Sequence, residues 1–139
     1  MDDITAIALH PDMQTVATGE IGPKPLIQIW KYRSKSFTKV TTIKGGKKGL
    51  QKGVCALAFS PKGKYLAAAA IDTDHYVAVY NPQDGKRISL AKSGGNPIFQ
   101  LCWCTDKNFV AVGPKSYQFW SEGPKGFTKK TGAMSKVSD

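Results

Sequence analysis

One short pattern occurs three times along this 139-residue chain. A run of alternating small and large apolar residues begins at Ile4, Val54 and Ile98, at intervals of about 50 and about 44 residues. A second apolar run follows each of them, and a third run ends on an aromatic residue in every copy. Periods of roughly 40 to 50 residues built from short strands are typical of the blades of a β-propeller. The sequence therefore predicts an all-β fold.

Each copy is expected to form one four-stranded antiparallel blade. Apolar alternation predicts the inner strands, and the more polar, lysine-bearing run at the end of each copy suits an outer edge strand. The expected blades cover about 4–43, 54–91 and 98–131, and a basic tail covers 132–139. Because closing a propeller takes roughly four to eight blades, three blades are expected to form part of a ring that is not closed by itself.

The first strand of each copy has large apolar residues on one face and small ones on the other. This pairing lets neighbouring blades nest at native packing density, so both faces should be covered. The two end blades should then keep one uncovered face each, bearing Ile7 and Leu9 or Leu101 and Trp103. Cys102 holds a small position and is expected to be a buried structural thiol.

Composition narrows the function classes. Twenty Lys and Arg against ten Asp and Glu give a net charge of +10, which favours acidic partners such as nucleic acid, an anionic membrane or a polyacidic protein. No apolar run approaches the roughly 18 residues of a membrane span, and the acidic N-terminus lacks the pattern of a signal peptide. Three cysteines, an odd number, fit a reducing cytoplasm.

The three copies resemble WD40 repeats. An alternating strand, a turn of the Ser-Pro-Lys-Gly type and a Leu-Ala-Ala or Val-Ala-Thr strand are followed by Trp30, Tyr80 and Trp120, where that family places the tryptophan of its Trp-Asp pair. The turn aspartate of the family has a candidate in the second copy only, at Asp72 or Asp74. These are structural repeat positions, and the glycine-histidine pair usual between blades is replaced by glycine pairs.

A narrower resemblance covers nearly the whole chain. The order Ala-Leu-His-Pro-Asp, Val-Ala-Thr-Gly, Ile-Trp, Lys-Gly-Val and Phe-Trp is similar to the opening blades of the first propeller in echinoderm microtubule-associated protein-like (EML) proteins. This resemblance implies association with microtubules or ciliary axonemes and a cytoskeletal location in the cytoplasm. The family's coiled-coil segment and the hydrophobic motif before its propeller have no counterpart in this sequence.

Lysines in two segments are the candidate partner-binding residues. The connector at 44–53 interleaves lysines with glycines, without the spacing of a phosphate-binding P-loop. A solvated connector that contributes only solubility is the alternative interpretation. The candidates are Lys44, Lys47, Lys48 and Lys52 in the connector, and Lys125, Lys129 and Lys130 near the C-terminus.

Aromatic residues beside the outer strands are interpreted as packing residues. Phe37 and Phe127 each lie seven residues after a repeat tryptophan, and such repetition favours an architectural role over a partner contact. Tyr32 is interpreted in the same way.

The sequence favours a non-enzymatic scaffold that binds proteins, with tubulin, axonemal proteins or further blades as partners. No catalytic group, metal site, cofactor, small-molecule substrate or membrane contact is expected, because no nucleophile-base pair or ligand cluster recurs. The alternative is a nucleic-acid-associated scaffold of the ribosome or of RNA processing. Bases would require exposed aromatics interleaved with Lys or Arg, and the connector at 44–53 has none.

Overall fold

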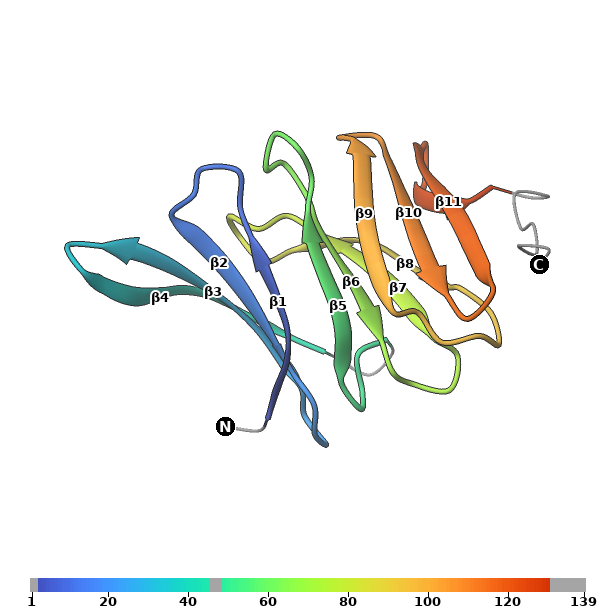
Figure 1. The fold of residues 1–139 in the computed structure, drawn as a ribbon, viewed down its shortest axis with the longest axis horizontal. Coiled ribbons are helices and arrows are strands. Elements are labelled where there is room, and N and C mark those ends of the chain that lie inside the picture. Colours follow the sequence, from blue (N-terminus) through green and yellow to red (C-terminus); the bar gives the residue numbers. More distant parts are fainter. Residues whose placement is uncertain (1–2, 46–48, 131–139) are drawn as a thin grey trace.

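The computed structural model describes residues 3–45 and 49–130. Within these residues, twelve strands form three four-stranded antiparallel sheets, and no helix is present. The strands of each sheet follow one another in chain order. Figure 1 shows the three sheets arranged side by side as an open row, with the first strands β1, β5 and β9 next to one another. The predicted all-β fold and open ring are confirmed.

The strand bounds repeat from sheet to sheet. The first sheet contains β1 (Ile4–Leu9), β2 (Thr15–Glu20), β3 (Leu26–Arg33) and β4 (Ser36–Lys44). The second contains β5 (Val54–Phe59), β6 (Leu66–Ala70), β7 (Tyr76–Tyr80) and β8 (Arg87–Lys92). The third contains β9 (Gln100–Thr105), β10 (Asn108–Gly113), β11 (Ser116–Gly123) and β12 (Gly126–Lys129). The expected tail at 132–139 lies outside the described residues.

The first and second blades enclose one hydrophobic core. Leu57 and Phe59 of β5 belong to it, and Ala6 and Ala8 of β1 pack against it. Large side chains of one blade thus meet small side chains of the blade before it. Across this interface the Thr5 hydroxyl donates a hydrogen bond to the Val54 carbonyl oxygen, 2.7 Å away.

The second and third blades enclose another hydrophobic core, in which large side chains again meet small side chains of the preceding blade. Leu101 and Trp103 of β9 pack with Ala56 and Ala58 of β5. The Trp103 indole nitrogen donates a hydrogen bond to the Ala58 carbonyl oxygen at 2.9 Å. In both interfaces the large face of a first strand points to the preceding blade, and the small face points to the following blade.

Aromatic rings dominate this second core. Phe109 stacks on Trp120 with 5.8 Å between ring centroids, and Phe127 contacts Tyr65 edge-on at 5.2 Å. Offset and edge-on pairs of this kind add to the stabilisation that comes from burying their large apolar area.

The open faces of the end blades differ from each other. Ile7 and Leu9 are 71% and 52% exposed on the first blade, as the sequence predicts. Leu101 is only 4% exposed and Trp103 is partly buried, so the prediction that these two residues lie on an uncovered face is wrong, because this face of the third blade packs against the second blade. Cys102 is exposed instead of buried, since the small face of the third blade has no neighbour among the described residues. Phe37 is 59% exposed, whereas its repeat counterpart Phe127 is buried.

No helix among the described residues has the length and apolar character needed to cross a bilayer.

Candidate functional site

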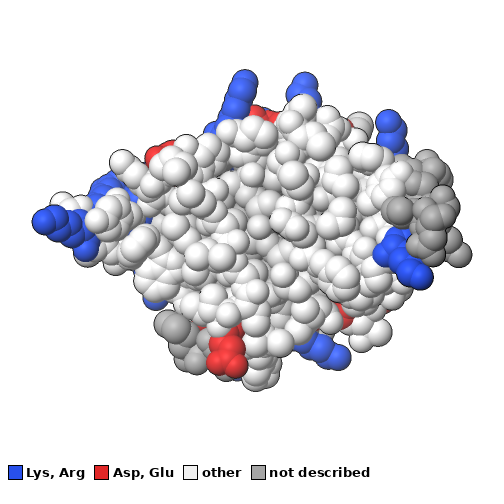
Figure 2. Space-filling view, viewed as in Figure 1, with Lys and Arg blue, Asp and Glu red and all other residues white. Residues whose placement is uncertain are grey.

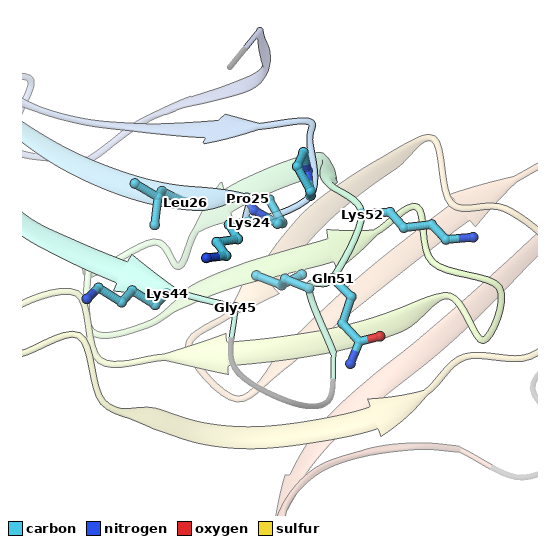
Figure 3. A pocket seen from close by; sticks show the side chains of 9 residues that line it. Lys24, Pro25, Leu26, Lys44, Gly45, Gln51 and Lys52 are labelled. Atoms are coloured by element: carbon cyan, nitrogen blue, oxygen red, sulfur yellow. The ribbon is translucent and has the colours of Figure 1, made fainter. Parts of the chain in front are cut away.

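A cleft of about 900 Å³ opens where the first blade meets the connector to the second blade. Three segments form it: the turn before β3, the end of β4 and the connector that leads to β5 (Figure 3). Lys24, Lys44 and Lys52 line it together with the apolar residues Leu26 and Leu50. We name this feature the lysine cleft. The remaining lining residues are Pro23, Pro25, Gly45 and Gln51.

The lysine cleft combines exposed cations with an apolar interior. All three lysines are exposed, whereas Leu26 is half-buried and Leu50 is almost fully buried. In Figure 3 the side chains of Lys24 and Lys44 extend in one direction and the Lys52 side chain extends in the opposite direction, so the positive charges are not gathered at one point. Such a cleft can receive a segment that carries both carboxylates and apolar groups.

The sequence predicted this site in part. Lys44 and Lys52 were candidates and both line the cleft, but Lys24 was missed because it lies 20 residues earlier in the chain. The sequence pattern that could have identified Lys24 is the run Gly22–Pro25, in which one glycine and two prolines indicate a turn with an exposed lysine. Lys47 and Lys48 lie outside the described residues.

A buried carboxylate holds the connector in place. Asp72, 7% exposed, accepts hydrogen bonds from the backbone N–H groups of Gln51 and Lys52 at 2.8 and 2.7 Å. Gly22 N–H also donates to the Lys52 carbonyl oxygen at 2.8 Å, which ties the connector to the first blade. Asp72 therefore positions Lys52 at the cleft, whereas the Asp74 carboxylate lies 3.5 Å from the Lys92 ammonium group.

Glycine is required where the connector approaches β4. A side chain in place of Gly45 would collide with the backbone of Leu50. This close approach brings Lys44 and the buried Leu50 into the same cleft.

The second group of candidate lysines does not join the cleft. Lys125 and Lys130 are exposed on the third blade. Lys129 is half-buried, and its ammonium group donates to the Ser93 carbonyl oxygen at 2.8 Å. The contact made by Lys129 bridges the third blade to the segment after β8, which is a structural role.

The repeat aromatics are structural in all three blades. The Trp30 indole nitrogen donates to the Thr18 hydroxyl at 3.0 Å, and that of Trp120 donates to the Gln118 side-chain oxygen at 3.3 Å. Tyr80 is 2% exposed, and desolvation by burial raises its pKa to about 12, with the nearby Arg87 acting in the opposite direction. None of the three lines the cleft.

No group of three or more His, Cys, Asp or Glu side chains suitable for a metal ion occurs within residues 3–45 and 49–130. The clearest perturbed carboxylate is that of Asp12, in the turn between β1 and β2. Partial burial acts to raise its pKa, but hydrogen bonds from Gln14 and Thr15, with the charge of His10, lower it to about 2. These contacts stabilise the turn.

Comparison with known proteins identifies the repeat. The family model described as "WD domain, G-beta repeat" matches residues 37–81, which run from β4 to the position of the Trp-Asp pair. The chain is a WD40-repeat propeller segment. Solved WD40 propellers share its fold. It superposes with a TM-score of 0.75 on a chain of the mitotic checkpoint complex, at 23% identity over 98% of this chain and 41% of that one. The RRP9 WD40 repeats also give 0.75, at 18% identity over 92% and 38%.

The names of two sequence relatives of this WD40 segment refer to cilia and to microtubules. The ciliary WD repeat-containing protein ctxp80 of Euplotoides octocarinatus is 32% identical over 94% of this chain and 18% of its own length. The 77 kDa echinoderm microtubule-associated protein of Strongylocentrotus purpuratus is 30% identical over 97% of this chain and 21% of its own length. The WD40 segment thus spans about a fifth of the length of these curated relatives.

Proposed function

We propose that this WD40 segment is a non-enzymatic scaffold that binds an acidic protein surface of microtubules or of an axoneme through the lysine cleft. The observation that carries the proposal is that Lys24, Lys44 and Lys52, which come from three separate segments, all line one partly apolar cleft. The corresponding location is the cytoskeleton of the cytoplasm or of a cilium.

Electrostatics favours an acidic partner. The chain carries a net charge of +10, and the tails and surface of tubulin are strongly acidic. Exposed ion pairs contribute roughly 0.2–1 kcal/mol each, so the three lysines act as a group. Salt screens such contacts over a Debye length of about 8 Å at physiological ionic strength.

The chemistry of the lining favours protein over nucleic acid. Binding of single-stranded RNA or DNA relies on aromatic side chains on which bases stack, and none of the nine lining residues is aromatic. The half-buried Leu26 and the exposed Pro23 offer apolar contacts that suit side chains of a peptide. The microtubule-associated and ciliary relatives support the same choice.

Co-sedimentation of the full 139-residue chain with polymerised microtubules tests the proposal. Changing Lys24, Lys44 and Lys52 together to Glu should weaken binding by roughly tenfold at low salt, because three attractions become repulsions. A matched control changes the exposed lysines Lys62, Lys107 and Lys115 to Glu, which alters the net charge equally away from the cleft.

The control should bind much more tightly than the cleft variant. Equal loss of binding in the two variants would mean that only net charge matters, and unchanged binding in both would remove the lysine cleft from the interaction. Removal of the acidic tubulin tails from the microtubules should reduce binding of the unmodified chain and have little further effect on the cleft variant.

A further inference from the structure

A second groove lies between the first and second blades, and its volume is about 340 Å³. Lys31, Arg33 and Val40 line it from the first blade, and Gly63 and Gln83 line it from the second. We name it the hairpin groove. Both of its walls are blades of this chain that pack directly against each other, so the groove is a feature of their interface.

The β3–β4 hairpin forms one wall of the hairpin groove because it is longer than its counterpart in the second blade. Pairing between β7 and β8 ends at Tyr80, whereas in the first blade three further residue pairs follow the equivalent Trp30. These pairs include Lys31 and Arg33. Figure 1 shows the tip of this hairpin extending beyond the other strands. The second blade has a turn at the corresponding place, and its Gln83 lines the opposite wall.

Strand geometry turns Lys31 and Arg33 toward the second blade. Ile29 is buried in the core that the first and second blades share. Side chains two residues apart on a strand lie on the same face of the sheet, so Lys31 and Arg33 follow Ile29 in one row. Lys31 is half-buried and Arg33 is exposed. The groove therefore has one partly sheltered cation and one fully accessible cation.

The tip of the hairpin is strongly basic. Residues 31–39 contain Lys31, Arg33, Lys35 and Lys39 but no Asp or Glu. Figure 2 shows Lys and Arg side chains gathered at the end of the molecule where Figure 1 places this tip. Neither Lys31 nor Arg33 forms an ion pair with any residue that the structure describes. Their charges remain available to a partner, and a concentration of one sign of charge attracts the opposite sign.

One carboxylate, that of Asp12, lies among the lining residues but is engaged within its own turn. It accepts hydrogen bonds from the backbone N–H groups of Gln14 and Thr15, both at 2.8 Å, and from the Thr15 hydroxyl at 2.7 Å. The same turn places His10 against the second blade, with its Nε2 atom 3.3 Å from the Gly63 carbonyl oxygen. A side chain at Gly63 would collide with this imidazole ring. Contacts between its own lining residues thus hold the groove in shape, and little ordering is needed when a ligand binds.

Val40 adds an apolar contact beside the cations. The register of β3 against β4 shifts between Ile29 and Trp30, which leaves Val40 outside the paired residues, as in a β-bulge. Its side chain is 53% exposed. None of the described residues that line the groove is Phe, Tyr or Trp, so the bases of a nucleic acid would find no such ring on which to stack. A peptide with acidic and apolar side chains fits this lining better.

We propose that the hairpin groove binds an acidic peptide segment of a partner protein. A carboxylate of the segment pairs with the Arg33 guanidinium, whose planar fork can donate two parallel hydrogen bonds to it. Lys31 supplies a second positive charge, and a neighbouring apolar side chain of the segment contacts Val40. The occupant is argued from charge complementarity, since four cations lie at this tip and the carboxylate of Asp12 is already hydrogen-bonded.

This proposal does not rest on the lysine cleft. β3 runs from Leu26, which lines the cleft, to Arg33, which lines the hairpin groove. Strands rise roughly 3.3 Å per residue, so the two sites lie roughly 20 Å apart at opposite ends of this strand. They share no lining residue. Either site can therefore fail its test while the other passes.

Fluorescence anisotropy with a labelled peptide tests the proposal on the full 139-residue chain. The probe is a fluorescein-labelled octapeptide in which Glu alternates with Leu. Changing Lys31 and Arg33 together to Glu should weaken binding roughly tenfold or more, because two attractions become repulsions. The matched control changes Lys35 and Lys39 to Glu, which alters the charge of the same hairpin equally although neither residue lines the groove. The control should weaken binding by less than roughly threefold.

Two further arms separate the hairpin groove from the lysine cleft and from simple charge attraction. Repeating the comparison in a chain with Lys24, Lys44 and Lys52 changed to Glu removes any peptide bound at the cleft, and the difference between groove variant and control should persist. A second probe has Ser in place of each Leu. Val40→Ser should weaken binding of the Leu probe roughly threefold and leave binding of the Ser probe unchanged.

Arg33→Ala keeps the test decisive if the double variant fails to fold, because Arg33 is exposed. This single change should weaken binding of the Leu probe roughly threefold with unchanged circular dichroism. Equal losses in the groove variant and its control, unchanged binding in the groove variant, or no binding to the unmodified chain would each overturn the proposal. A single-stranded oligonucleotide of the same net charge that displaced the probe better than unlabelled peptide would overturn it in favour of nucleic acid.

Discussion

Replacing Asp72 tests how the fold positions the lysine cleft. Asp72→Ala removes a buried carboxylate that accepts two backbone hydrogen bonds, from Gln51 and Lys52. A hydrogen bond to a charged group contributes about 1.5–3 kcal/mol, and water can partly replace the acceptor at the exposed connector. We therefore expect the free energy of unfolding to fall by about 2–4 kcal/mol in total. Urea unfolding followed by tryptophan fluorescence measures this loss.

A matched substitution lies two residues away. Asp74 is half exposed and its carboxylate lies 3.5 Å from the Lys92 ammonium group, an exposed ion pair. Asp74→Ala should cost about 0–1 kcal/mol. Asp72→Asn, which retains one acceptor oxygen, should fall between the two alanine variants. Similar small losses for Asp72→Ala and Asp74→Ala would refute the view that the buried carboxylate anchors the connector.

Three further predictions follow from burial and hydrogen bonding. Phe127→Ala should lower the free energy of unfolding by about 3–5 kcal/mol in urea titrations, whereas Phe37→Ala, at the exposed equivalent position, should change it by about 0.5 kcal/mol or less. Tyr65→Phe removes the hydroxyl that donates to the Glu122 carboxylate at 2.9 Å and should cost about 1 kcal/mol in the same assay. The folded pKa of Asp12, about 2, lies below its ordinary 3.8. Its contribution, about 1 kcal/mol after allowance for exposure, should be present above pH 4 and lost as the pH falls toward 2, and Asp12→Asn should remove this pH dependence.

The strands could be predicted because their cause is local. Alternation of small and large residues and turn-forming Pro and Gly lie within each copy, so the third copy was found even though its turn lacks proline. The direction in which each face points could not be predicted, because all three first strands carry the same pattern. Leu101 and Ile7 are equivalent in sequence, and only the position of their blades makes one buried and the other exposed.

The site was harder to predict because its parts are distant in sequence. Lysines of the connector were visible as a run, but Lys24 joins them only through the packing of the turn before β3 against the connector. Asp72 also acts through a hydrogen bond to Lys52, about 20 residues away in the chain. From the sequence alone, Asp72 and Asp74 were equal candidates for this kind of role. The glycine and the two prolines around Lys24 indicate a turn, but they do not indicate which segment this turn packs against.

Site-specific cross-linking tests the lysine cleft most directly. A photo-reactive amino acid in place of Gln51, which lines the cleft, should cross-link the chain to the acidic tail of tubulin on polymerised microtubules. The same group in place of Lys107, an exposed turn residue of the third blade, should give little product. Strong cross-links from position 51 that disappear at high salt are the predicted result. Cross-links of equal yield from both positions, or from position 107 alone, would contradict the assignment of the lysine cleft as the partner-binding site.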